Sequence, residues 1–269
     1  MSTEHAGYLP QADASTLVDR CELELQVQAM YRELARDPRA PRHFATGGEV
    51  ALRIGYPQSL LDEVPADALA RFAGVGYHFD LAGLEPGDSV LDLGSGSGTD
   101  VFCAAALVGA RGLVVGVDFT DAQLAAARRA ADEGGIANVH FVEADIDQLP
   151  FDDAEFDVVI SNGVINLSPV KQRVFSEAAR VVRPDGRFVL ADIVSAIPLK
   201  EATRRNTELW AACIAGAIPT SAYLDALAAA GFAITARRRN DYAFMSERAL
   251  DACSTYGVES VSIAAVRSR

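Results

Sequence analysis

A glycine-rich loop lies between a short apolar run and a helical segment of this sequence. The stretch reads VLDLGSGSGTD over residues 90–100. In sheets of parallel strands, ligands lie at the carboxyl ends of the strands, where the next helix offers unpaired N–H groups. A dinucleotide loop of the form G-x-G-x-x-G would need its last glycine where this chain has Thr99. Asp92, two residues before the first glycine, instead favours a positively charged ligand group such as an amine.

Two further acidic residues end the next two predicted strands. VVGVD ends at Asp118, which is placed to accept hydrogen bonds from both hydroxyls of a ribose. FVEAD ends at Asp145, which can accept from an adenine amino group while Ile146 covers the ring. One such acid alone is more often a helix cap, and Asp100 is interpreted as one. Three acids at successive strand ends indicate a site for a nucleoside that carries a cationic amine.

The pattern D-x-G-x-G-x-G with these acids is typical of enzymes that use S-adenosylmethionine. This cofactor joins adenosine to methionine through a positively charged sulfur. The residues that we expect to bind it from this part of the chain are Asp92, Gly94, Ser95, Gly96, Gly98, Asp118, Phe119, Thr120, Gln123, Asp145 and Ile146.

The elements that position these residues alternate between strand and helix. Strands are expected at 90–93, 113–117, 139–142, 156–160, 187–191, 232–239 and 258–267. Helices are expected at 16–36, 99–109, 121–133, 169–183 and 221–230, with a further helical stretch that reaches about residue 217. This order predicts an α/β fold: a Rossmann-like doubly wound sheet, mostly parallel with an antiparallel C-terminal strand, behind a helical N-terminal cap over 1–80.

Composition excludes several classes of partner. The 269 residues are half apolar, and the formal net charge of −13 argues against nucleic acid and anionic membranes as partners. Four separated cysteines without a CxxC pair argue against a metal site or a disulfide framework. No leader-like start and no membrane-spanning apolar run are evident, so we expect a cytoplasmic protein with a small-molecule substrate. The oligomeric state stays open.

The chain resembles the class I S-adenosylmethionine-dependent methyltransferases, and in particular the branch of the arsenite methyltransferases. The resemblance runs from about Phe44 to the end and is carried by FATGGEVALRIGYP, FAGVG, VLDLGSGSGTD, VVGVDFT, ISNGVINLSP and CIAGA. It implies that residues 81–269 form the cofactor-binding methyltransferase domain. It also implies that the segment 196–220 covers the substrate.

The resemblance assigns roles to the end of the fourth predicted strand. Asn162 is expected to hold the methionine amine through its amide or its backbone carbonyl. In the arsenite enzymes the next position is a cysteine of the arsenic-binding set, whereas this chain has Gly163, and Val75 stands in for another member. Of that set only Cys213 remains, with Cys21 of the first helix as a further thiol that could approach, and trivalent arsenic needs about three sulfur ligands. Gly163 either makes room for a bulkier organic substrate or provides a tight turn.

The acceptor side offers weaker candidates. His78, in AGVGYHFD, is the candidate general base, with a structural hydrogen bond or solvent exposure as the alternative. The candidate substrate-contacting residues are Phe44, Tyr77, Gly163, Asn166, Trp210 and Cys213. The leading hypothesis is a methyltransferase that acts on a thiol, hydroxyl, amine or carbon of a small molecule. The alternatives are a metalloid methyltransferase with a reduced thiol set and a cofactor-binding protein that transfers no methyl group.

Overall fold

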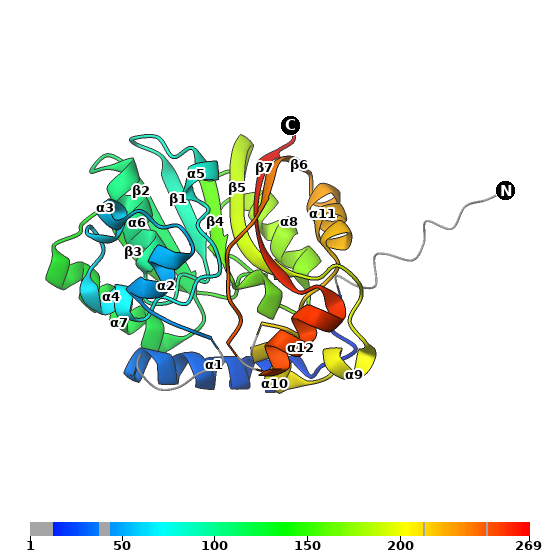
Figure 1. Cartoon of the computed structure of the whole chain (residues 1–269). Coiled ribbons are helices and arrows are strands. Elements are labelled where there is room, and N and C mark those ends of the chain that lie inside the picture. Colours follow the sequence, from blue (N-terminus) through cyan, green and yellow to red (C-terminus); the bar gives the residue numbers. More distant parts are fainter. Residues whose placement is uncertain (1–12, 38–43, 212, 246) are drawn as a thin grey trace.

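The computed structural model describes residues 13–37, 44–211, 213–245 and 247–269. In these ranges one seven-stranded sheet is covered by helices, and further helices lie across one end of it (Figure 1). The fold class expected from the sequence is confirmed. None of the described helices combines the length and the apolar character that crossing a membrane requires.

The sheet has the strand order β3-β2-β1-β4-β5-β7-β6, and β7 runs antiparallel to both of its neighbours. The strands are β1 (Ser89–Leu93), β2 (Leu113–Asp118), β3 (Val139–Glu143), β4 (Phe156–Asn162), β5 (Val182–Val194), β6 (Phe232–Arg239) and β7 (Glu259–Arg267). Leu93 of β1 pairs with Val117 of β2 and Ser161 of β4, so the carboxyl ends of these three parallel strands meet at one edge. The predicted ligand-binding residues are therefore brought together by the register of the sheet.

Two pairs of helices cover the two faces of the sheet. The helices α6 (Thr99–Val108) and α7 (Asp121–Gly134) pack against one face, and α8 (Lys171–Val181) and α11 (Thr220–Ala229) pack against the other. The central strands are apolar on both faces, as a parallel sheet buried between helices requires. Val158, Val159 and Ile160 of β4, for example, are fully buried.

The described residues of the N-terminal segment form one long helix and several short ones. They include α1 (Arg20–Arg36), α2 (Gly48–Arg53), α3 (Gln58–Leu61) and α4 (Ala66–Ala70). The short helix α5 (Phe79–Ala82) packs against β5 and β7 instead, at the other end of the sheet from α1 (Figure 1). The helix expected from residue 16 begins only at Arg20, because the Asp19 side chain accepts a hydrogen bond from the Glu22 N–H and caps it there. Figure 1 shows α1 running across the end of the sheet.

The segment after β5 differs from the single helical stretch that was expected. It forms the short helices α9 (Glu201–Arg204) and α10 (Thr207–Ala211), and Cys213 has a positive φ of 58°. A left-handed residue cannot continue an α-helix, so the chain turns here. A helix that was not expected, α12 (Glu247–Tyr256), lies near α10 at the same end of the sheet (Figure 1). Residues 165–167 form a short 3₁₀ helix, η2 (Ile165–Leu167), between β4 and α8.

Candidate functional site

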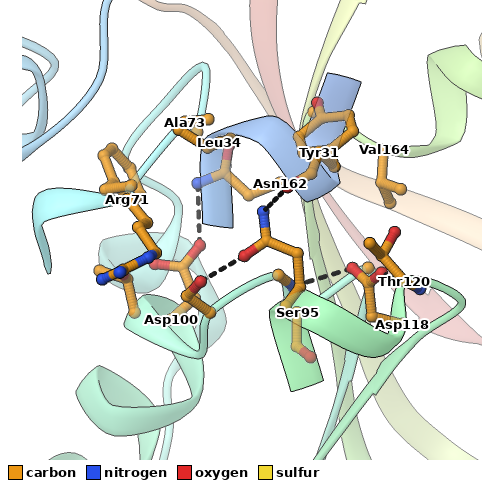
Figure 2. Close-up of a pocket in the computed structure, with 18 of the residues that line it drawn as sticks. Tyr31, Leu34, Arg71, Ala73, Ser95, Asp100, Asp118, Thr120, Asn162 and Val164 are labelled. Carbon is orange, nitrogen blue, oxygen red and sulfur yellow. Dashed lines mark hydrogen bonds between the residues drawn. The ribbon is translucent and has the colours of Figure 1, made fainter. Parts of the chain in front are cut away.

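Two adjoining cavities open at the carboxyl ends of the strands, beneath α1. Their volumes are about 660 and 550 Å³, including the open space at each mouth. The residues that line both cavities, and so join them into one cleft, are Val27, Gly94, Asp118, Phe119, Val164 and Leu167. In the first cavity, Tyr31 of α1 lies above the floor, with Arg71 on one side and Asp118 and Thr120 on the other (Figure 2).

Asp118 ends β2 and is held by the glycine loop. Its two carboxylate oxygens accept hydrogen bonds from the backbone N–H groups of Gly96 (3.0 Å) and Thr120 (2.8 Å). Burial raises the pKa of Asp118, and these backbone bonds partly oppose that rise. Each oxygen keeps a further lone pair for a ligand hydroxyl. Gly96 adopts a positive φ of 53°, which favours glycine at this turn of the loop.

Asp92 lies in the wall of the first cavity, and its carboxylate accepts no hydrogen bond from the described residues. It is only 2% exposed. Burial, with the nearby charges of Asp100 and Asp118, raises the pKa of Asp92 well above its usual value. An uncompensated buried carboxylate is costly, and a cationic ligand group would relieve that cost. The environment of Asp92 therefore fits an ammonium or sulfonium group.

The second cavity carries the residues predicted to contact adenine. Asp145 and Ile146, just beyond β3, both line it, as do Arg20 and Asp147. Arg20 of α1 donates two hydrogen bonds to the Asp147 carboxylate (2.9 and 3.1 Å) and lies 3.8 Å from Asp145. The apolar surface of Ile146 beside the Asp145 carboxylate suits a flat ring with an amino group.

The carboxylates in the wall of the first cavity fit a bound ligand. Asp92 accepts no hydrogen bond from the described residues, and Asp118 keeps acceptor capacity beyond its bonds to the Gly96 and Thr120 N–H groups. An amine and the hydroxyls of a ribose are groups that such carboxylates bind. The residues present therefore fit S-adenosylmethionine.

The helix α1 is fixed over the cleft by side-chain bonds to the sheet domain. Gln28 donates to the carbonyl of Phe119 (3.2 Å), and Gln123 of α7 donates to the carbonyl of Tyr31 (3.1 Å). Arg32 pairs with Asp121 at the exposed start of α7 (3.0 Å). These bonds hold α1 in place as one wall of the cleft.

Replacing Arg20 with alanine should speed release of S-adenosylhomocysteine about fivefold, because it removes a partly buried, two-pronged ion pair worth about 1 kcal/mol. Stopped-flow fluorescence would measure the rate. Arg32→Ala is the matched control: both arginine side chains are 37% exposed, but Asp147 is 5% and Asp121 66% exposed. Equal release rates for the two variants would contradict a specific role for the Arg20 ion pair.

Asn162 lies in the wall of the first cavity, but its amide is used within the protein. Its oxygen accepts from the N–H of Val75 (2.8 Å), and its nitrogen donates to Asp100 (2.9 Å) and to the Gly76 carbonyl (3.0 Å). This corrects the expectation that the amide holds the methionine amine. Asn162 instead fixes the cap to β4, and its backbone carbonyl remains as the proposed contact. Gln123 likewise uses its amide to hold α1.

His78 corrects the prediction of a general base. Its ring is fully buried, stacks on Phe79 with ring centroids 4.6 Å apart, and lines neither cavity. Burial lowers the pKa of His78, which favours the neutral ring. The position of His78 just before the first strand indicated a place near the sheet. It did not indicate that the side chain would be buried by packing.

Three predicted substrate contacts lie outside the lining of both cavities: Trp210 and Asn166 are buried, and Tyr77 is partly exposed. Trp210 is 1% exposed and donates from its ring N–H to the Arg204 carbonyl (2.7 Å). Asn166 is fully buried and donates to the Cys213 carbonyl (2.6 Å). Tyr77 packs edge-on against Tyr56, with centroids 5.0 Å apart, and lines neither cavity. These three predictions are corrected: packing, rather than substrate contact, explains their positions.

Gly163, Val75 and Cys213 converge beside the first cavity. A Cβ added to Gly163 would lie 3.2 Å from a methyl of Val75, and the Cys213 Sγ lies 3.9 Å from the Gly163 carbonyl oxygen. Gly163 has a φ of 77°, so a tight turn is needed here, and Val75 already fills much of the adjoining space. Phe44 stacks on Tyr31 with centroids 6.3 Å apart, but it lines neither cavity.

Sequence reasoning missed several residues in the wall of the first cavity. Asp100 is not a simple helix cap: it is buried and accepts from the hydroxyl of Tyr56 (2.6 Å) as well as from Asn162. Arg71 is the one basic residue among those that line this cavity, and Tyr31 of α1 also lines the cavity. Arg71 comes from the cap, so no local pattern beside the glycine loop could have indicated it, whereas Tyr31 was already suggested as a cap residue near the cofactor.

Comparison with known proteins agrees with this geometry. A methyltransferase domain family matches residues 84–243. The arsenite methyltransferase of Halobacterium salinarum is 39% identical over 188 residues, which are 70% of this chain and 47% of that protein. A ubiquinone/menaquinone biosynthesis C-methyltransferase UbiE of Ectopseudomonas mendocina is 35% identical over 54% of this chain and 56% of its own length. The chain thus spans about half the length of these curated relatives.

A solved structure is similar over a larger share of the chain. The crystal structure of an arsenic(III) S-adenosylmethionine methyltransferase from Chlamydomonas reinhardtii has a TM-score of 0.62 and 32% sequence identity, covering 84% of this chain and 75% of that one. The matched family covers more than half of the present chain and includes the glycine loop and all three strand-end acids. The chain belongs to the S-adenosylmethionine-dependent methyltransferases.

Proposed function

We propose that this chain transfers the methyl group of S-adenosylmethionine to a small, uncharged organic molecule. The observation that carries the proposal is the acidic cleft under α1, in which Asp92, Asp100 and Asp118 line one cavity. The cofactor supplies a methyl group on a positively charged sulfur. Asp92 would hold its amine and Asp118 its ribose, while Asp145 and Ile146 would hold the adenine. Arg71, whose Nε and Nη1 already bond to Ala35 and Asp67, would offer its Nη2 to the carboxylate of the cofactor. Position, alignment and exclusion of water then carry most of the catalysis.

The acceptor side of the site favours an uncharged molecule. Cys213, Tyr242 and Phe244 all pack against the apolar cluster that contains Val75, and Cys213 lies beside the Gly163 carbonyl, so this region is apolar and partly aromatic. Burial raises the pKa of Cys213 to about 12 and that of Tyr242 above its usual value, so both groups stay protonated near neutral pH. A charged acceptor would lose its hydration here without gaining a partner of opposite charge. The acceptor atom must also be nucleophilic without help from His78, because His78 is buried away from both cavities and cannot remove the acceptor's proton.

The names of the relatives favour arsenite as a second candidate substrate. Against it, the described part of the chain contains no group of three His, Cys, Asp or Glu side chains placed to hold a metal ion. A Cys213 thiol with a raised pKa is also a poor ligand, because the thiolate is the binding form. These observations favour an organic acceptor over trivalent arsenic.

A matched pair of acceptors tests the proposal. The purified protein would be incubated with deuteromethyl S-adenosylmethionine and phenol, 4-hydroxybenzoate, thiophenol, aniline or arsenite, with products followed by mass spectrometry. We expect phenol to react at least about tenfold faster than 4-hydroxybenzoate, since burying an unpaired carboxylate costs more than about 1.4 kcal/mol. Preference for the carboxylate-bearing phenol, or formation of methylarsenicals, would overturn the proposed acceptor class.

A further inference from the structure

A buried lysine lies behind the acceptor side of the cleft. Lys171, the first residue of α8, is only 2% exposed. Its ammonium group donates hydrogen bonds to the carbonyls of Ser168 (2.9 Å) and Asn166 (3.1 Å) and lies 5.1 Å from the centre of the Trp210 ring. Two carbonyls and an aromatic face are the partners that a buried ammonium group needs. The two carbonyls belong to the loop between β4 and α8, and the aromatic ring belongs to α10.

The β4–α8 loop, residues 163–168, reaches both halves of the site. Gly163, Val164 and Leu167 line the first cavity, and Val164 lies so close to Gly94 that a Cβ added there would be 2.4 Å from a Val164 methyl. In the other direction, the Asn166 amide donates to the Cys213 carbonyl. The loop therefore contacts the cofactor-binding glycine loop on one side and the acceptor side on the other.

The charges around Lys171 come from three elements. Asp192 of β5 attracts the ammonium group, Arg204 of α9 repels it, and Cys213 after α10 would attract it as a thiolate. Asp192 uses its own oxygens elsewhere: they accept from the Tyr223 hydroxyl of α11 (2.9 Å) and from the Ile193 N–H (2.8 Å). The charge of Asp192 thus compensates that of Lys171 from nearby, while the Lys171 ammonium group donates its hydrogen bonds to carbonyls of the β4–α8 loop.

We propose that Lys171 is a positioning residue for methyl transfer, whose ammonium group holds the β4–α8 loop in the shape that binds the cofactor. The inference rests on the proposed function for its role in catalysis, but its effect on cofactor binding can be measured alone. A charged donor forms stronger bonds to carbonyls than a neutral amine does. Loss of the charge also removes the attraction to the Trp210 ring. The loop is therefore held most firmly when Lys171 is protonated.

The protonation state of Lys171 changes within the physiological range. Burial lowers the pKa of Lys171 to about 7, with the Asp192 charge opposing this effect, and burial raises the pKa of Asp192 to about 6. A ligand that binds better to the protonated form must, by linkage, raise the pKa of that group. Bound S-adenosylhomocysteine is thus expected to raise the pKa of Lys171.

The single tryptophan makes this shift visible. Trp210 is the only tryptophan of the sequence and its ring faces Lys171, so its fluorescence should report the titration of that group. With saturating S-adenosylhomocysteine, the midpoint near pH 7 should rise by about 0.7 pH unit, which corresponds to about fivefold tighter binding to the protonated form. Lys171→Met should lose the transition and bind S-adenosylhomocysteine about fivefold more weakly than the wild type at about pH 6.

The chain supplies a matched control, since Lys200 is its only other lysine and is exposed at the start of α9. Lys200→Met should retain the transition and the wild-type affinity. An unchanged wild-type midpoint on ligand binding would overturn the inference, even if Lys171→Met failed to fold. So would affinities of wild type and Lys171→Met within about twofold. If the wild type does not bind S-adenosylhomocysteine at all, the proposed cofactor site fails, and this inference fails with it.

Discussion

Asp118→Ala is expected to bind S-adenosylhomocysteine about a hundredfold more weakly than the wild type. The carboxylate is proposed to accept hydrogen bonds from both ribose hydroxyls, and each charge-assisted bond contributes about 1.5 kcal/mol. The substitution also frees the Gly96 and Thr120 N–H groups that now donate to Asp118. Isothermal titration calorimetry would measure the change in affinity.

Asp121→Ala is the control for this prediction. Asp121 lies only three residues farther along the chain, but it is exposed and pairs with Arg32 on the surface. We expect the affinity of the Asp121→Ala variant for S-adenosylhomocysteine to stay within about twofold of the wild-type affinity. A smaller effect of Asp118→Ala than of Asp121→Ala would show that the ribose is not bound at the end of β2.

The Asp92→Asn variant is expected to bind S-adenosylhomocysteine at least about tenfold more weakly than the wild type. Its affinity for 5′-methylthioadenosine should be unchanged. The two ligands share the nucleoside, but 5′-methylthioadenosine lacks the amino acid group that Asp92 is proposed to hold. Asparagine keeps the shape of the side chain and removes its charge. The Asp118→Ala variant should bind both ligands more weakly. The two variants together therefore show which end of the cleft binds the amino acid group and which binds the nucleoside.

The pH dependence supplies a second readout for Asp92. Burial raises the pKa of Asp92, so the carboxyl takes up a proton as the pH falls and loses its attraction for the amine. The affinity for S-adenosylhomocysteine should therefore decrease at lower pH, and Asp92→Asn should flatten that decrease. Equal loss of both ligands in Asp92→Asn would contradict the placement of the amine beside Asp92.

The parts of the site that the sequence predicted are those set by local geometry. The glycine loop and the acids Asp92, Asp118 and Asp145 each follow a strand, and parallel pairing brings all three ends to one edge. The seven strands themselves were predicted because they are short apolar runs between helical segments. A strand period and a turn residue are properties of neighbouring residues, so they can be read without knowing the rest of the fold.

The parts that were missed depend on side chains from distant segments. Asp100 was interpreted as a helix cap because its partners Tyr56 and Asn162 lie 44 and 62 residues away in the chain. His78 and Trp210 are residue types that often act in sites, but tertiary packing buries both. The direction in which a side chain points from an irregular segment is decided by that packing. It leaves no periodic signal in the sequence.

The acceptor-covering segment shows the same limit. Residues 196–220 were expected to cover the substrate, and α9 and α10 lie in this range, at the end of the sheet where α1 lies (Figure 1). Their break into two short helices, and the turn at Cys213, were not predicted. The turn depends on the left-handed conformation of Cys213 and on the bond from Asn166 to its carbonyl, which joins it to the β4–α8 loop. Its role over the substrate remains a prediction.

The most direct test of the central claim is calorimetry of the wild-type protein with S-adenosylmethionine and, separately, with NAD⁺. The acidic cleft should bind S-adenosylmethionine with one site per chain and should not bind NAD⁺, because Asp92 would repel a pyrophosphate and the glycine loop has Thr99 where a dinucleotide loop has its last glycine. Binding of NAD⁺, or no heat with S-adenosylmethionine, would contradict the account.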